Sequence, residues 1–343
     1  MVFEIKISEY LSSGLPLIDV RSPGEYVRGH IPEAVNIPLF TNEERAKVGT
    51  LYTKVSPEKA VEAGLELVRP KLDWFLEEAR RAAPGNETAV HCWRGGLRSR
   101  SFANHLSENG FKWVNVITGG YKAYRHHVLR FYEDPPELRI VGGYTGSGKT
   151  EIIGALSSLG EQAIDLEGLA CHKGSSFGAI GCGVQPTTEQ FENNLYEAFR
   201  VLDRNRPVWL EDESHNIGGV NLPMALWQLM QKSPTWFIRI PREVRAAWLV
   251  KTYAQYGPGV LQEATQRISR RLGSEQCAKA MERIAAGQYL DAALILLTYY
   301  DKSYENALHL HQRGKVVEIT SESVNSIQNS LKILQYENHR AVD

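Results

Sequence analysis

The chain is poor in cysteine, in net charge and in long apolar runs, and each shortage excludes a class of protein. Its four cysteines, among 343 residues, lie far apart and form no Cys-x-x-Cys pair. This argues against a disulfide framework or a Cys-rich zinc site and favours a reducing compartment. The net charge of −1 gives no global attraction to nucleic acid or to an anionic membrane. Any RNA binding must therefore come from a local basic face.

No stretch of the sequence has the length and apolar character of a membrane-spanning helix. The most apolar stretch, residues 290–300, is interrupted by Asp291 and is too short to cross a bilayer. The first residues, MVFEIKISEYLSSG, carry charged side chains and lack the apolar core of a signal peptide. We therefore expect no membrane association and a cytoplasmic location.

Two successive α/β patterns are present. A length of 343 residues is too great for one typical core and suits two domains. Short β-branched runs alternate with helical stretches through the first 130 residues, and a second such series follows a proline-containing linker at residues 133–137. We predict an α/β protein with domains at residues 5–132 and 138–343, the second containing a mostly helical C-terminal region.

The expected elements can be placed along both domains by hydrophobic periodicity. The expected strands are residues 15–20, 34–37, 88–92, 114–117, 138–142, 207–211, 236–240 and 316–319. The expected helices include residues 56–82, 97–108, 121–132 and 149–159.

A glycine-rich loop around Cys92 follows one predicted strand and precedes a helix. In the sequence HCWRGGLRS, residues 91–99, the glycines let successive backbone N–H groups converge above the sulfur, where the helix N-terminus adds partial positive charge. Arg94 and Arg98 would supply two cationic donors. We expect Cys92 to ionise more readily than a free cysteine and to act as a nucleophile, because an inert core cysteine rarely lies in such a loop.

Two segments upstream, residues 18–26 and 29–38, resemble the signature motifs of rhodanese domains, and with the cysteine loop the resemblance covers about residues 5–130. We expect both segments to be scaffold, with an ion pair between Asp19 and Arg21. Many small sulfur-transferring rhodaneses resemble Cys-x4-Arg here, whereas this loop is Cys-x5-Arg and has room for a tetrahedral anion. Cysteine-dependent phosphatases of rhodanese-like fold look similar, so the loop permits chalcogen transfer or phosphoester hydrolysis.

Residues 143–150, GYTGSGKT, match the Walker A pattern between a predicted strand and a predicted helix. The expected phosphate-binding residues are Gly143, Thr145, Gly146, Ser147, Gly148, Lys149 and Thr150. Backbone N–H groups would wrap a di- or triphosphate, Lys149 would reach its outer oxygens, and Thr150 would ligate Mg²⁺. A second Mg²⁺ ligand should be an acidic residue that ends a buried strand. Asp212 is our candidate, with Glu211 as the alternative.

Two further segments give weaker signals. Residues 170–178 form a Gly/Ser-rich loop that could lie over a substrate. Cys171, His172 and Cys182 suggest a metal site, but no fourth ligand is evident, and we favour the substrate loop.

Basic residues are frequent among the predicted helices of residues 242–271. Arg267, Arg270 and Arg271 are spaced to share one helix face, which could contact an RNA backbone. A solvated helix face is an equally good interpretation of the sequence.

The combination and order of these motifs are similar to those of bacterial tRNA 2-selenouridine synthases. Further stretches that carry the resemblance are residues 48–52, 93–99, 142–150 and 211–214. The resemblance implies a transferase that acts on wobble 2-thiouridine in the tRNAs for Lys, Glu and Gln. It implies that geranyl diphosphate first geranylates the sulfur, and that selenium from selenophosphate then replaces the S-geranyl group to give 2-selenouridine. tRNA is the implied partner, with selenophosphate synthetase as selenium supplier.

The two anion loops would divide this work. The P-loop with Lys149, Thr150 and Mg²⁺ would stabilise the departing diphosphate. Cys92, with Arg94 and Arg98, would carry selenium as a perselenide or hold selenophosphate. Two alternatives remain open: a cysteine-dependent phosphatase or sulfurtransferase fused to a P-loop kinase, and a binding module whose P-loop is a nucleotide switch.

Overall fold

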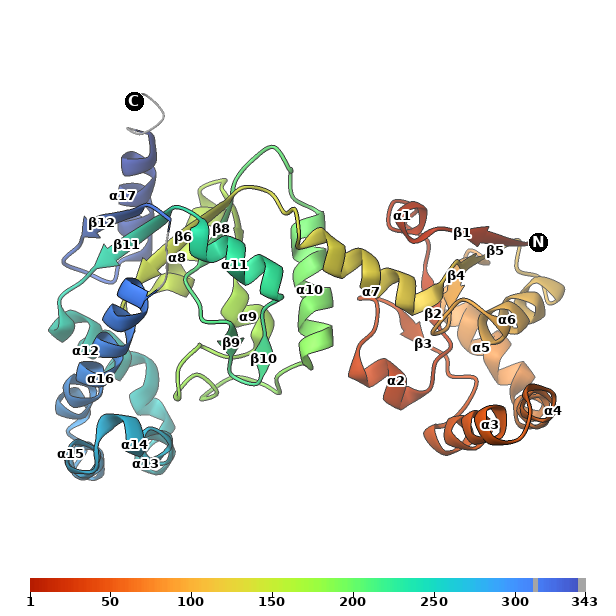
Figure 1. Ribbon diagram of the computed structural model, residues 1–343, viewed down its shortest axis with the longest axis horizontal. Helices are drawn as coiled ribbons and strands as arrows, with labels where there is room; N and C mark the ends of the chain where they lie inside the picture. Colours follow the sequence, from red (N-terminus) through yellow and green to blue (C-terminus); the bar gives the residue numbers. More distant parts are fainter. Residues whose placement is uncertain (311–313, 339–343) are drawn as a thin grey trace. The chain divides into compact units, whose positions relative to one another are not determined.

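The computed structural model describes residues 1–310 and 314–338, and the side chains of residues 1–305 and 314–337. The chain forms two units, Met1–Phe131 and Tyr132–Asp343 (Figure 1). The second predicted domain, residues 138–343, includes residues 311–313 and 339–343, which lie outside the described part of the chain.

The first unit is built on a parallel sheet with the strand order β1-β5-β4-β2-β3. Its strands are β1 (Val2–Ile5), β2 (Leu17–Asp19), β3 (Val35–Asn36), β4 (Glu87–His91) and β5 (Trp113–Ile117). The central strand β4 is buried from its second residue onward, so Cys92 emerges at its carboxyl end. The sequence predicts four of these strands and misses β1, which is half-buried only at its two ends.

Helices connect the strands of the first unit (Figure 1). They are α1 (Ile7–Tyr10), α2 (Pro23–Arg28), α3 (Asn42–Lys54), α4 (Pro57–Val68), the 3-10 turn η1 (Arg69–Lys71), α5 (Leu72–Ala82), α6 (Leu97–Glu108) and α7 (Gly120–Phe131). The prediction of one helix over residues 56–82 is wrong. Two helices meet there at Pro70, which has no backbone N–H to donate to the preceding turn.

The second unit contains another parallel sheet, in the order β12-β11-β6-β8-β7. Its strands are β6 (Leu138–Gly143), β7 (Gln162–Ile164), β8 (Val208–Glu211), β11 (Thr235–Arg239) and β12 (Val316–Thr320). The pairing of Val141 with Glu211 puts the carboxyl ends of β6 and β8 side by side. Because ligands bind at this edge of parallel sheets, the register brings the P-loop next to the acidic strand end.

Helices before and after β11 complete the second unit, together with the hairpin β9 (Asn216–Ile217) and β10 (Val220–Asn221). The helices are α8 (Lys149–Ser158), α9 (Leu166–Ala170), α10 (Thr188–Arg200), α11 (Met224–Lys232), α12 (Arg242–Tyr253), η2 (Ala254–Tyr256), α13 (Pro258–Arg267), α14 (Ser269–Leu272), α15 (Ser274–Ala285), α16 (Tyr289–Leu310) and α17 (Ser326–Asn338). The segment from α12 to α16 is the helical region expected from the sequence. None of the described helices is both long and apolar enough to cross a membrane.

Candidate functional site

The Cys92 loop joins β4 to α6 in the first unit. The side chain of Cys92 is buried, and its Sγ lies 3.3 Å from the hydroxyl oxygen of Ser99 in the first turn of α6. Burial raises the pKa of the Cys92 thiol, but the Ser99 hydroxyl, the charge of Arg98 and the backbone N–H groups of Arg94 and Ser99 favour the thiolate. Together they hold the pKa of Cys92 below its ordinary value, the direction that the sequence predicts.

Backbone groups at the start of α7 hold the Cys92 loop in place, and they were not among the predicted site residues. The backbone N–H of Tyr121 donates to the carbonyl of Cys92 at 2.9 Å, and that of Lys122 donates to the carbonyl of Trp93 at 3.0 Å. Gly120 has a φ of 57°, and a Cβ there would lie 2.3 Å from the Cys92 carbonyl oxygen. Only glycine fits this approach, so the start of α7 fixes the shape of the cysteine loop.

The two arginines of the loop have different surroundings. Arg98 donates from Nη1 to Glu25 Oε2 at 3.1 Å, while Arg94 is exposed. The prediction that both would point their donors at the sulfur therefore needs correction for Arg98, whose guanidinium is held by a carboxylate. It still acts on Cys92 through its charge.

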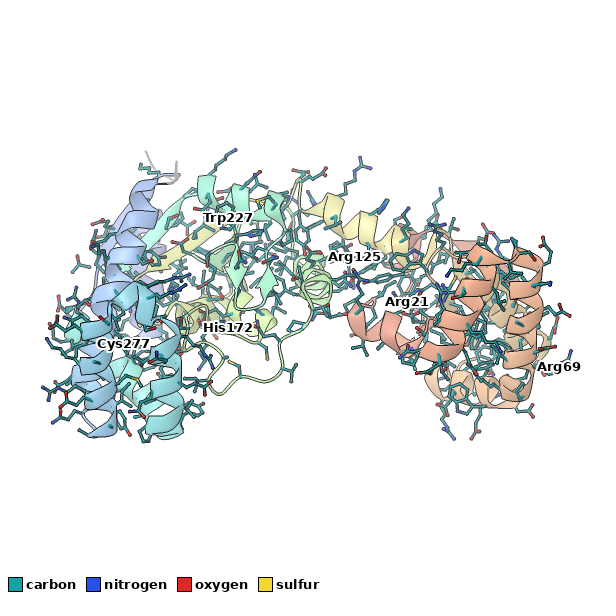
Figure 2. The ribbon with its side chains drawn as sticks, turned by 60° about the horizontal axis from the view of Figure 1, so that its bottom comes forward. Arg21, Arg69, Arg125, His172, Trp227 and Cys277 are labelled. Carbon is teal, nitrogen blue, oxygen red and sulfur yellow. The ribbon has the colours of Figure 1, made fainter. Side chains whose placement is uncertain are left out.

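A buried charge network supports the sheet beneath the loop. Arg21, which Figure 2 labels in the first unit, forms the predicted ion pair with Asp19, with a shortest N···O distance of 2.6 Å. Both side chains are buried. The Arg21 guanidinium also donates to the carbonyl of Gly29 and lies over the ring of Tyr121. His91 lies 3.6 Å from Asp19. Burial, the largest influence, lowers the pKa of His91, so this imidazole is neutral at pH 7. The network is structural.

The P-loop connects β6 to α8 in the second unit. Gly146 and Gly148 have φ angles of 81° and 75°, which glycine adopts without strain. Behind the loop, a Cβ on Gly143 would lie 2.4 Å from Ser147 Oγ. Among the described residues, the buried Oγ of Ser147 has no hydrogen-bond partner. Because buried hydroxyls are normally bonded, this atom is available to a ligand in the loop.

Lys149 and Thr150 lie at the start of α8, where the Walker A pattern predicts them. Thr150 donates from its hydroxyl to Glu167 Oε2 at 2.5 Å. Glu167 lies in α9, just after β7, and was not among the predicted site residues. Its position shortly after the short strand β7 is the only signal of this role, and the Walker pattern does not use it.

The acidic residues after β8 divide into buried and cavity-facing groups. Glu211 is fully buried and accepts from the Glu167 backbone N–H, whereas Asp212 and Glu213 line the cavity beside the P-loop. Asp212 accepts from the hydroxyl of Tyr304 at 2.5 Å. Burial, with repulsion from Glu167 and Asp212, raises the pKa of Glu213 to about 8 despite the attraction of Lys149.

Mg²⁺ fits this site through oxygen donors. Within the described residues, no three His, Cys, Asp or Glu side chains form a group that would hold a metal by themselves. Mg²⁺ at phosphate sites takes only one or two protein ligands, with phosphate and water oxygens completing the octahedron. Thr150 and Asp212 both line the cavity and supply hard oxygen ligands of that kind. Cys171, His172 and Cys182, all in the described part of the chain, likewise form no group that would hold a metal.

The helical region braces the P-loop. Arg245 of α12 is buried, donates to the Thr145 carbonyl at 3.0 Å, and forms a bidentate pair with Asp301 of α16. This basic residue therefore orders the loop and cannot contact RNA.

The predicted basic face differs from its expected form. Arg267 ends α13, whereas Arg270 and Arg271 lie in the separate α14, so the three do not share one helix. The break between α13 and α14 falls at Ile268, whose side chain is buried in one cluster with Leu296 and Ala280. All three arginines are exposed, and Arg267 pairs with Glu263 at 2.8 Å.

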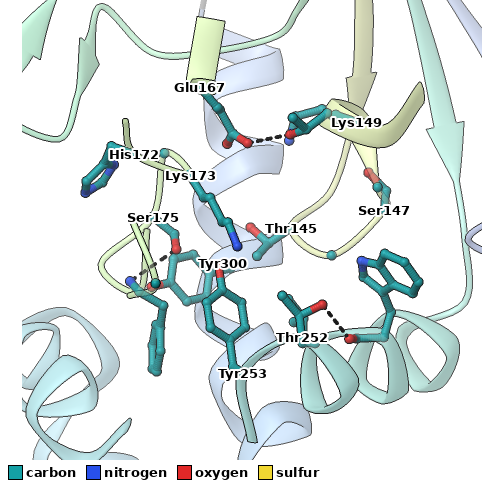
Figure 3. Close-up of a pocket in the computed structure, with 18 of the residues that line it drawn as sticks. Thr145, Ser147, Lys149, Glu167, His172, Lys173, Ser175, Thr252, Tyr253 and Tyr300 are labelled. Carbon is teal, nitrogen blue, oxygen red and sulfur yellow. Dashed lines mark hydrogen bonds between the residues drawn. The ribbon is translucent and has the colours of Figure 1, made fainter. Parts of the chain in front are cut away.

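One cavity of about 720 Å³ includes most of the predicted P-loop residues. It is lined by Thr145 through Thr150, by Asp212, and by the substrate loop expected at residues 170–178. Lys173 of that loop lies with its Nζ 5.4 Å from the ring centre of Tyr253, and Figure 3 shows it beside Thr145. Neither Gly143 nor the exposed arginines line this cavity.

Comparison with known proteins gives the same two-part division. Residues 136–333 match the family model described as tRNA 2-selenouridine synthase AAA domain, and residues 6–127 match the Rhodanese-like domain. These matches confirm the predicted fold class: a rhodanese-like domain followed by a P-loop α/β domain with a helical C-terminal region.

Several curated proteins named tRNA 2-selenouridine synthase are similar over most of the chain. The protein of Cupriavidus pinatubonensis is 38% identical over 295 residues, covering 77% of each chain. That of Psychromonas ingrahamii is 35% identical, covering 78% of this chain and 71% of its own. That of Shewanella frigidimarina is 33% identical, covering 88% of this chain and 91% of its own.

Proposed function

The chain belongs to the tRNA 2-selenouridine synthase family, and from this premise we propose that it converts wobble 2-thiouridine in the tRNAs for Lys, Glu and Gln to 2-selenouridine. The observation that carries the proposal is the presence of two glycine-rich loops of different chemistry, one in each unit. One contains a cysteine with a lowered pKa, and the other is a P-loop that opens into a cavity. A two-step transfer uses both.

The first step is geranyl transfer at the second unit. The thione sulfur bonds to carbon 1 of geranyl diphosphate, and the carbon–oxygen bond breaks with its electrons leaving on diphosphate. Lys149 and the backbone N–H groups of the P-loop receive the developing charge. The unpartnered Ser147 hydroxyl donates to the same group. Mg²⁺ held by Thr150 and Asp212 would supply further neutralising charge.

The second step is selenium transfer at the first unit. Alkylation has converted the sulfur into a better leaving group, so a selenium nucleophile can attack carbon 2 while geranyl thiolate departs. The Cys92 loop binds selenophosphate, with Arg94 and the loop N–H groups as donors. Cys92 and its loop hold selenophosphate while its selenium attacks carbon 2, and water then breaks the selenium–phosphorus bond and releases phosphate. Selenophosphate synthetase is the supplier that this chemistry requires.

Mass analysis of wobble nucleosides tests the proposal. Cells that lack the protein should contain 2-thiouridine but no 2-selenouridine, and the gene product should restore the selenonucleoside. Phosphate release from simple aryl phosphates by the purified protein, with unchanged wobble nucleosides, would instead support the phosphatase alternative.

A further inference from the structure

The cavity of the second unit has a lining of two chemical kinds. Around the P-loop it presents Ser147, Lys149 and Thr150, and Figure 3 shows Tyr253 and Tyr300 in the same cavity. It is also lined by aliphatic side chains from the helical region. These are Leu261 of α13, Ile284 of α15, and Ala292, Ala293 and Leu296 of α16, which we call the tail lobe.

The tail lobe lies between separate parts of the helical core. Leu261, Ile284 and Ala292 belong to one buried cluster, Ala293 to a second and Leu296 to a third. Each of the five is at most 9% exposed. Protein interiors leave few voids larger than a water molecule, and an unfilled void destabilises the fold. Because side chains from all three clusters line one cavity, that cavity offers apolar surface to a ligand.

The side chains of the lobe decide what kind of ligand fits. None of the five carries a donor or acceptor, so none can bind a ribose or read a nucleobase edge. They suit a hydrocarbon chain, which needs only dry apolar surface. The cavity volume of about 720 Å³ lies within the roughly 300–1,000 Å³ typical of small-ligand sites. A phosphate cradle continuous with such a lobe selects an anionic head with an apolar tail.

We propose that the tail lobe binds the hydrocarbon tail of an isoprenyl diphosphate whose head lies in the P-loop, and that the lobe sets the accepted chain length. The small side chains of Ala292 and Ala293 leave the space open, and Ile284 limits it. The inference rests on the proposed function because it assigns the tail of that substrate.

Two variants should change the chain-length preference in opposite directions. Ala292→Leu fills the lobe and should favour the five-carbon dimethylallyl diphosphate. Ile284→Ala enlarges it and should favour the fifteen-carbon farnesyl diphosphate. Ile268→Ala is the matched control, because Ile268 and Ile284 are both 2% exposed in the same helical region but only Ile284 lines the cavity.

Calorimetry measures the affinities in the presence of Mg²⁺. The full chain is titrated with inorganic diphosphate and with each of the three isoprenyl diphosphates. The wild type should bind geranyl diphosphate roughly 1,000-fold more tightly than dimethylallyl diphosphate, since each of the five additional carbons contributes about fourfold when it is buried. Ala292→Leu should lower the ratio of geranyl to dimethylallyl diphosphate affinity at least tenfold. Ile284→Ala should raise the ratio of farnesyl to geranyl diphosphate affinity at least tenfold. The affinity for inorganic diphosphate should stay unchanged in both variants. The control should stay within twofold of the wild type.

Unchanged ratios in both variants would overturn the inference, as would a wild type that binds the isoprenyl and inorganic diphosphates equally. Binding of ATP that weakens in both variants would make the lobe a nucleoside site instead and overturn it as well. Failure of the proposed function looks different. A protein with the expected chain-length preferences that does not geranylate thiolated tRNA would leave the tail lobe intact and refute the tRNA chemistry.

Discussion

The Sγ atom of Cys92 lies 3.3 Å from the hydroxyl oxygen of Ser99, seven residues later in the chain. The loop between them wraps the sulfur, and the hydroxyl favours the thiolate over the thiol. Ser99→Ala should therefore raise the pKa of Cys92, since burial, which raises it, remains. The rate of iodoacetamide alkylation against pH should shift to higher pH in this variant.

Ser101→Ala is the matched control for that measurement, because Ser101 lies exposed on the same helix. Its alkylation profile should overlay that of the wild type. Identical profiles for Ser99→Ala and the wild type would show that the hydroxyl does not stabilise the thiolate.

Replacing the cysteine itself separates the two steps. Cys92→Ser should abolish selenium incorporation and leave S-geranylation of thiolated tRNA within about twofold of the wild type, because the two anion loops lie in different units. Cys277→Ser, another buried cysteine, serves as control and should retain both steps. Equal loss of both steps in Cys92→Ser, with normal folding by circular dichroism, would contradict separate sites.

Of the two carboxyl groups at the end of β8, only that of Asp212 should need its negative charge for Mg²⁺-dependent diphosphate binding. Burial, with repulsion from Asp165, raises the pKa of Glu211 well above its ordinary value of 4.5 and so favours the neutral form of this side chain. Glu211→Gln should therefore keep Mg²⁺-dependent diphosphate binding. Asp212→Asn should weaken it roughly tenfold or more by removing a metal oxygen of full charge. Calorimetry with diphosphate and Mg²⁺ distinguishes the two, and equal losses would argue against Asp212 as the metal ligand.

The raised pKa of Glu211 predicts that the stability of the protein depends on pH. A carboxyl whose folded pKa is raised binds its proton more tightly when folded, so its contribution is complete below about 4.5 and is lost as pH rises. Glutamine has no proton to lose. The midpoint of thermal unfolding of Glu211→Gln, relative to that of the wild type, should therefore rise between pH 5 and pH 8, and a falling difference would reverse the assignment.

The exposed arginines test RNA recognition. Arg270→Glu with Arg271→Glu should weaken tRNA binding and reduce the slope of log affinity against log salt by about one to two. The same reversal at Arg80 and Arg81, which end α5 in the first unit, should leave both quantities near the wild type. An unchanged affinity through the salt titration would return Arg270 and Arg271 to a solvated surface.

Local sequence predicts local features of this protein well. The glycines at 146 and 148 and the strand before them identify the P-loop, and an Asp and an Arg two residues apart, at Asp19 and Arg21, form the predicted pair. Contacts between distant segments could not be predicted in this way. Gly120 reaches the Cys92 loop only because β4 and β5 are neighbours in the sheet.

The same limit applies to the second unit. Glu167 meets Thr150 across the parallel sheet, and Arg245 reaches the P-loop from a helix about a hundred residues away. A basic side chain in a helix looks alike in the sequence whether it faces solvent or is buried against a partner such as Asp301. Tertiary packing decides between the two.

The central claim is that the P-loop holds an isoprenyl diphosphate and the Cys92 loop handles selenium, and Lys149→Ala tests it most directly. Purified wild-type protein should geranylate thiolated tRNA with geranyl diphosphate and Mg²⁺ and without ATP or GTP. Lys149→Ala should lower that rate at least about 100-fold, because it removes the cation that stabilises the leaving diphosphate. Selenation of tRNA that already carries the S-geranyl group should proceed in this variant at the wild-type rate. A strict requirement for a nucleoside triphosphate, or loss of selenation together with geranylation, would contradict the account.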